Sequence, residues 1–202
     1  MIIRSLLASL VVGTLTAGWA DAPRPMTFDD LMRVQRVSDP QISPDGRHLA
    51  VVVGATEFEA NRVNTDIWLV PLGDDGLPIG EPKKWTGSPR HDRHPRWSPD
   101  GRWIAFESNR EGEYQIYLLP ASGGEAHRLT TLATEATQPV WSRDGKSLAF
   151  VSAVFPEFSD RPFAEADAAN RSRLKSRDES KVKARVMTNL LYRHWDSWVD
   201  GK

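Results

Sequence analysis

Ser43-Pro44-Asp45-Gly46, Ser98-Pro99-Asp100-Gly101 and Ser142-Arg143-Asp144-Gly145 are three copies of one short turn. Ser at the first position, Pro at the second and Gly at the fourth are the residues that a type I turn favours. Asp100 follows Asp45 by 55 residues, and Asp144 follows Asp100 by 44. This spacing is close to the period of about 40 to 50 residues that is typical of four-stranded propeller blades. The turns therefore predict a repeat protein in which each unit begins with a β-hairpin.

The repeat extends on both sides of the turn. A proline precedes each turn by three residues, and an apolar run follows each turn; the runs are Leu49–Val52, Ile104–Phe106 and Leu148–Val151. Because these residues are consecutively apolar, we expect strands that are buried on both faces. Two later segments also recur, namely Asp66–Pro71 with Gln115–Pro120 and Lys84–Thr86 with Arg128–Thr130. We therefore expect an all-β fold, an incomplete β-propeller of four-stranded blades with WD40-like or Tol-type repeats.

Trp97 and Trp141 occupy equivalent places, each directly before the Ser of its turn. An aromatic residue that recurs with the repeat is better explained by packing between blades than by ligand binding.

The chain divides into five expected segments. Arg4, the apolar stretch 6–15 and Gly18-Trp19-Ala20 have the pattern of a cleaved secretory signal. Thr27 and Asp30 are spaced as a capping box, which predicts a short helix. The segments are a signal peptide at 1–20, a lead-in with this helix at 21–35, propeller blades at 36–154, a charged and partly helical insertion at 155–191, and the truncated start of a next blade strand at 192–202.

The helical part of the insertion is expected near its end. Val182, Val186 and Leu190 recur every four residues, which is the spacing of an amphipathic helix.

Composition excludes several classes of function. The net charge of −1 gives no reason to expect nucleic acid as a partner, and the chain has no Cys, so it forms no disulfides. The apolar stretch of the signal is shorter than the roughly 20 residues of a membrane span. We therefore expect a periplasmic or secreted protein with no stable membrane span after signal cleavage.

Catalytic motifs are missing from this sequence. It contains no Gly-x-Ser-x-Gly nucleophile elbow and no His-Glu-x-x-His pair, so we expect no catalytic residue, no metal site and no cofactor. The densest polar group, residues 91–94, is interpreted as a loop before a strand that begins at Pro95. Aromatic and polar residues cluster again near the end of the chain, and such a cluster is typical of the lining of a ligand cavity. These candidate substrate-binding residues are His194, Trp195, Asp196 and Trp198.

Three segments resemble the propeller of bacterial prolyl oligopeptidase family serine peptidases, in the dipeptidyl-peptidase and acylaminoacyl-peptidase branch. They are residues 26–46, residues 108–130 and Tyr192–Lys202. The middle segment is equally similar to the periplasmic propeller of the Tol system, whereas Tyr192–Lys202 resembles the peptidase branch.

The resemblance implies an N-terminal propeller that restricts access to a C-terminal α/β-hydrolase domain with Ser, Asp and His. Neither this domain nor its three residues are in the sequence, so short peptide substrates would be bound and hydrolysed by the missing domain. Two blades and a started third cannot close a ring, and we expect the front portion of a longer protein or of a gene record cut short. The alternative is a periplasmic β-propeller binding module without catalysis; a sugar-binding or polymer-binding propeller is a weaker third possibility.

Overall fold

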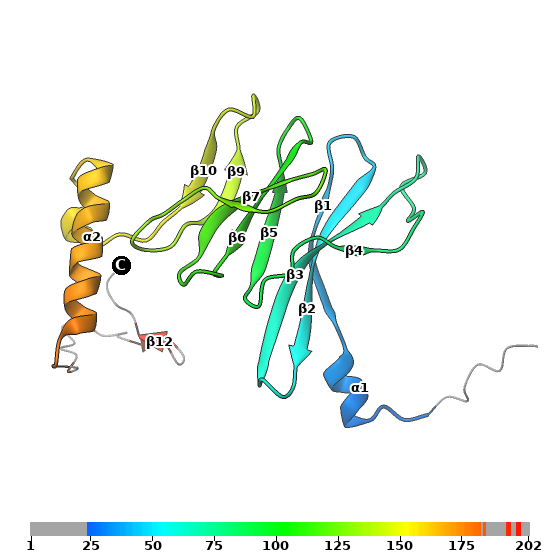
Figure 1. Ribbon diagram of the computed structural model, residues 1–202, viewed down its shortest axis with the longest axis horizontal. Helices are drawn as coiled ribbons and strands as arrows, with labels where there is room; N and C mark the ends of the chain where they lie inside the picture. The colour runs from blue at the N-terminus through cyan, green and yellow to red at the C-terminus, as the bar shows by residue number, and fades with distance from the viewer. Residues whose placement is uncertain (1–23, 183, 185–192, 195–196, 199–202) are drawn as a thin grey trace, which may run out of the picture.

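The computed structural model describes residues 24–182, 184, 193–194 and 197–198. Two antiparallel four-stranded sheets follow one another along the chain, and Figure 1 shows them side by side with a third, two-stranded sheet. Blade 1 contains β1 (Arg36–Ile42), β2 (His48–Glu57), β3 (Arg62–Pro71) and β4 (Lys83–Lys84). Blade 2 contains β5 (Asp92–Trp97), β6 (Trp103–Ser108), β7 (Gln115–Pro120) and β8 (His127–Arg128). Blade 3 contains β9 (Thr137–Trp141) and β10 (Leu148–Val151). The predicted fold class is confirmed.

The first strands of successive blades approach one another. β1 contacts β5, and β5 contacts β9, whereas β4 and β8 lie at the opposite edges of their sheets. In a propeller the blades surround a central channel. We therefore call β1, β5 and β9 the inner strands.

The three Ser-x-Asp-Gly turns have the same geometry. In each turn the Ser hydroxyl donates to Oδ1 of the Asp, over 2.5 Å in the first turn and 2.6 Å in the other two. The same hydroxyl accepts the backbone N–H that begins the second strand, over 2.9 to 3.0 Å. The glycines have φ angles of 72°, 70° and 68°, in the left-handed region that favours glycine. These bonds give the three hairpins that contain this turn the same register.

The main core lies between blades 1 and 2. Its buried residues come from the second and third strands of both sheets, and Trp97 packs against them; they are Ala50, Ile67, Leu69, Ile104, Phe106, Tyr117 and Leu119. Trp97 Nε1 donates to the carbonyl oxygen of Gln41, and Trp141 Nε1 donates to that of Arg96, each over 3.1 Å. Each indole thus reaches the inner strand of the preceding blade, which confirms the predicted packing role of both tryptophans.

The lead-in helix has the predicted form. α1 (Phe28–Arg33) is capped by Thr27, whose side chain accepts from Asp30 N while the Asp30 carboxylate accepts from Thr27 N. In Figure 1 it projects from the blade 1 end of the molecule.

The described helix of the insertion lies before the predicted one, and the structure tests that prediction only at Val182, which is not helical. A 3₁₀ turn (Pro156–Phe158) is followed by α2 (Phe163–Glu179), which ends before Val182 at the extended residue Ser180. Val182 is exposed, and Val186 and Leu190 lie outside the described residues. Polar contacts rather than an apolar stripe fix α2, because Asp167 Oδ1 accepts from Ala133 N over 2.7 Å and Asn170 Oδ1 accepts from Phe155 N over 3.3 Å.

Four of the expected segments lie wholly or partly outside the described residues. The signal at 1–20 does so entirely, the lead-in does so at 21–23, and the insertion does so at 183 and 185–191. Of the tail, the structure describes only β11 (Arg193–His194) and β12 (Ser197–Trp198), a short antiparallel pair. Within the described ranges, no helix is long and apolar enough to cross a bilayer.

Candidate functional site: a polar network on the inner strands

Blade 2 departs from the repeat in its polarity. At five positions its strands β5 and β6 have an ionisable side chain where the aligned residue of the third repeat is neutral. These are Asp92, Arg93, His94, Arg96 and Glu107, which correspond to Ala136, Thr137, Gln138, Val140 and Val151 when the turns are aligned. Strand formation alone does not require these charges, since the same backbone forms without them in blade 3.

A β-bulge interrupts the inner strand of every blade at the same place. The bulge residues are Asp39, His94 and Gln138, each directly before a proline, with φ angles of 48°, 60° and 53°. The pairing register shifts at each of these points. A bulge re-aims a side chain, and a left-handed φ is unfavourable for a residue other than glycine. The bulges therefore determine where the side chains of Asp39 and His94 point.

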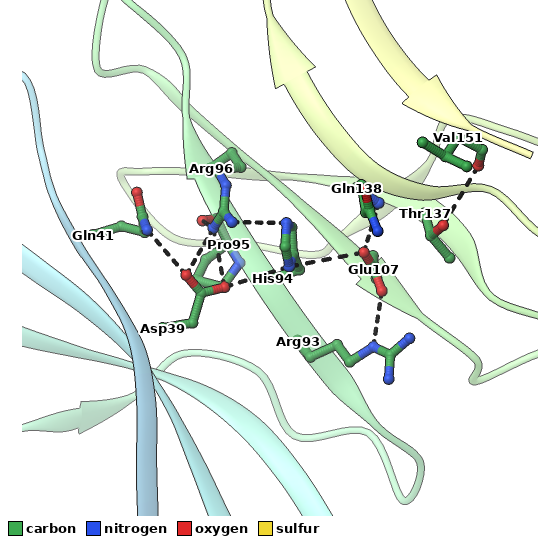
Figure 2. A network of polar contacts seen from close by, with 10 residues as sticks. All are labelled: Asp39, Gln41, Arg93, His94, Pro95, Arg96, Glu107, Thr137, Gln138 and Val151. Atoms are coloured by element: carbon green, nitrogen blue, oxygen red, sulfur yellow. Dashed lines mark hydrogen bonds and ion pairs between the residues drawn. The ribbon is translucent and has the colours of Figure 1, made fainter.

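Asp39 connects blade 1 to blade 2. Arg96 Nη1 donates to both carboxylate oxygens of Asp39, over 3.0 Å each, and Gln41 Nε2 donates to Oδ1 over 3.0 Å. Figure 2 shows Arg96 and His94 from β5 both turned toward this carboxylate. Because the Asp39 and Arg96 side chains are 24% and 25% exposed, water reaches this ion pair.

Glu107 connects blade 2 to blade 3. Its side chain is only 2% exposed, although the aligned positions in blades 1 and 3 hold valine. Oε1 accepts the backbone N–H of Gln138 over 2.6 Å, and Oε2 accepts from Arg93 Nε over 2.8 Å. A buried carboxylate needs such partners. Glu107 therefore holds the bulge of the next blade through its main chain.

His94 lies between these two connections. Its Nε2 is 2.7 Å from Arg96 Nη2, and its Nδ1 is 3.6 Å from Asp39 Oδ2 and 4.0 Å from Glu107 Oε1. The resulting network crosses three blades and consists of Asp39, Gln41, Arg93, His94, Arg96, Glu107 and Gln138 (Figure 2). It can bind charged groups or exchange protons.

The interpretation of residues 91–94 as a loop was wrong. Asp92, Arg93 and His94 belong to β5. Asp92 is fully buried, and its carboxylate accepts from Ser108 Oγ over 2.6 Å and from Arg110 Nη2 over 3.0 and 3.1 Å. These bonds satisfy a polar side chain inside the sheet, which the residue types alone did not reveal.

The turn carboxylates are electrostatically distinct from the network. The Ser98 hydroxyl, followed by bonds from Arg102, lowers the pKa of Asp100 from 3.8 to about 2. Bonds from Ser43 and Ser142 likewise lower the pKa of Asp45 and Asp144. These three carboxylates are ionised at neutral pH and hold the hairpin ends.

The candidate residues near the end of the chain are described only in part. His194 pairs with Ser197, and Arg193 pairs with Trp198, whereas Trp195 and Asp196 lie outside the described residues. Their role in substrate binding stays a prediction. Elsewhere, no group of three or more His, Asp or Glu side chains in the described part of the chain is arranged to hold a metal ion.

Comparison with known proteins agrees with the resemblance drawn from the residues. The uncharacterized peptidase YuxL of Bacillus subtilis (strain 168) is 37% identical over 124 residues, which are 61% of this chain and 18% of the relative. Dipeptidyl-peptidase 5 of Porphyromonas endodontalis is 28% identical over an alignment of 208 positions, which covers 98% of this chain and 28% of the relative. The chain thus spans less than a third of the length of either peptidase.

Solved structures and a family model identify the fold. The AtxE2 isopeptidase is similar, with a TM-score of 0.53 and 20% identity over 75% of this chain and 26% of its own. The model of the TolB beta propeller domain matches residues 33–173, which include every described blade strand. The chain therefore belongs to the TolB beta propeller domain family.

Proposed function

We propose that this chain is the propeller portion of an exported serine-type peptidase that hydrolyses short peptides in the manner of a dipeptidyl- or acylaminoacyl-peptidase. The observation that carries the proposal is the match to dipeptidyl-peptidase 5, which covers 98% of the chain. That match includes residues on both sides of the propeller family match at 33–173.

The hydrolysis itself belongs to a domain outside this sequence. In such a domain a Ser attacks the peptide carbonyl, His acts as the base, and backbone amides stabilise the oxyanion. The propeller contributes by excluding large substrates. Fixed contacts between neighbouring blades support this role, because the Asp39–Arg96 and Glu107–Gln138 bonds keep three blades at a constant spacing.

Recognition of the peptide's free amino end is assigned to the tail of the chain. A carboxylate suits an ammonium group, and Asp196 is the proposed ligand, with His194, Trp195 and Trp198 beside it in the sequence. The test is an Asp196→Asn substitution in the full-length protein, with the exposed Asp160→Asn as the control. We expect a higher KM for short peptides in the first variant alone, and an unchanged KM would remove Asp196 from this role.

Export is part of the proposal. The pattern of residues 1–20 supports a cleaved signal and a periplasmic or secreted location. N-terminal sequencing of the mature protein tests it directly, with cleavage after Ala20 as the expected result. An intact Met1 would contradict it.

The alternative, a periplasmic propeller that binds proteins without catalysis, is less supported. The family model alone does not separate the two functions. A TolB homolog matches 56% of the chain, whereas two dipeptidyl-peptidase 5 relatives match 98% and 97% of it.

The decisive experiment uses the full-length protein. We expect hydrolysis of dipeptide or N-acyl-amino-acid chromogenic substrates and covalent labelling by a fluorophosphonate, which reacts with activated serines. Absence of both, with a correctly folded protein by circular dichroism, would exclude the peptidase and favour the binding module.

A further inference from the structure

The junction of blades 1 and 2 contains a histidine that charged groups surround. Asp39 faces His94 from β1, Arg93 and Arg96 lie on its own strand, and Glu107 faces it from β6. From β9 only the main-chain N–H of Gln138 enters the network, through Glu107. Two carboxylates and two guanidinium groups balance, so the network has no net charge while His94 is neutral.

The contact with Arg96 determines the form of His94. A guanidinium group only donates hydrogen bonds, so Nε2 of His94 must accept the bond from Arg96 Nη2 at 2.7 Å. The ring is then neutral, and its proton is on Nδ1. This proton faces Asp39 Oδ2 at 3.6 Å and Glu107 Oε1 at 4.0 Å, which are too far for hydrogen bonds.

Protonation of the His94 ring would change which groups its two nitrogens can bind. An imidazolium donates from both nitrogens, so Nε2 can no longer accept from Arg96, and two cations would be 2.7 Å apart. At the same time Nδ1 would attract the carboxylates of Asp39 and Glu107. His94 is 32% exposed, so a proton from solvent can reach it.

We propose that His94 and Arg96 form a proton-operated switch on the inner strands. With His94 neutral, Arg96 bridges His94 and Asp39. With His94 protonated, the imidazolium pairs with the carboxylates of Asp39 and Glu107, and Arg96 Nη2 loses its hydrogen bond to the ring. The network then gains one positive charge. Histidine is the side chain that ordinarily changes charge between pH 5 and 8. The switch does not depend on the proposed peptidase function.

The backbone supports the switch by limiting other arrangements. Asp39 and His94 both have left-handed φ angles at a shift of register, and the proline after each has no N–H for a regular ladder, so neither bulge can become a regular strand without a change of register. The two side chains stay opposed while the proton is exchanged.

The test is nuclear magnetic resonance of the ¹⁵N-labelled protein, in which five histidines keep assignment simple. At pH 7.5 we expect the His94 proton on Nδ1, and between pH 7.5 and 5.5 we expect the Arg96 guanidinium signals to shift together with the ring signals. The Arg96 shift should vanish in His94→Gln and persist in the control His48→Gln. The wild-type spectra decide the question even where a variant fails to fold.

Three results would overturn the switch. They are a neutral His94 ring with its proton on Nε2, a His94 ring whose charge does not change between pH 7.5 and 5.5, and Arg96 signals that stay fixed while His94 changes charge.

Discussion

Replacement of Arg110 by Met should destabilise the protein strongly, because it leaves the Asp92 carboxylate buried without a counter-ion. Arg110 Nη2 donates to both oxygens of Asp92, which is 0% exposed, and Arg110 Nε donates to Ser108 Oγ. Removal of one partner of a buried ion pair costs about 3 to 5 kcal/mol. The Arg110 side chain is 25% exposed, and the Ser108 bond to Asp92 remains, so we expect a loss at or just below the low end of this range, about 2 to 3 kcal/mol.

Urea denaturation followed by circular dichroism measures this loss. With an m value of about 2 kcal/mol/M, the midpoint should fall by about 1 to 1.5 M. The matched control is Arg102→Met, whose ion pair with Asp100 is exposed at both ends, and this variant should lose at most about 1 kcal/mol.

A double variant separates the charge from the lost side chain. Asp92→Asn combined with Arg110→Met retains an acceptor for Ser108 and removes the buried charge, so it should be about 1 to 2 kcal/mol more stable than Arg110→Met alone. The reasoning fails if Arg110→Met is no worse than the Arg102 control, or if the double variant gains nothing.

Three further outcomes are expected. Carboxyl NMR titration should give Asp100 a pKa of about 2, and Ser98→Ala should raise this pKa. Because the pKa is lower in the folded protein than the ordinary value of 3.8, ionised Asp100 stabilises the fold above pH 3.8. This contribution is lost as the pH falls through 2. Trp97→Phe should cost about 1 kcal/mol in urea denaturation, and Trp85→Phe less, since the buried Trp85 Nε1 has no hydrogen-bond partner within the described residues. Gln138→Gly should be more stable to urea than Gln138→Ala by about 1 kcal/mol, because the φ of residue 138 is 53°, and the opposite order would refute strain at the bulge.

The sequence was sufficient to predict the blades because their signals are local. A turn such as Ser98–Gly101 fixes its own hydrogen bonds within five residues, and the apolar strand after it is buried as expected. The recurrence of Trp97 and Trp141 was enough to predict packing between blades, which both indole bonds confirm.

The polar network could not be predicted in the same way. Asp39 and Arg96 are 57 residues apart, and their contact depends on how one sheet packs against the next. The left-handed bulges have no signal of their own, since a residue before proline is ordinarily extended. One signal was available in the aligned repeats, where Glu107 replaces the valine of both neighbouring blades.

The bounds of helix α2 were not predicted, for a related reason. Its attachment relies on single polar groups, such as Asp167 bound to the Ala133 N–H, and not on a repeating apolar face. Periodicity therefore indicated a helix nearby but not its bounds.

The valines that correspond to Glu107 indicate that its carboxylate is not needed to form the strand. Val52 and Val151 occupy the same strand position in the same register, so the sheet itself accepts an apolar residue there. A buried carboxylate at such a position is retained only where its partners offset the cost of desolvation, and those partners come from Arg93 of its own blade and the Gln138 N–H of the next. The blades are thus held internally by apolar area, turn bonds and the Asp92–Arg110 pair of blade 2, whereas further charges and hydrogen bonds connect neighbouring blades. Changes in pH or salt should accordingly alter how the blades meet before they alter the blades themselves.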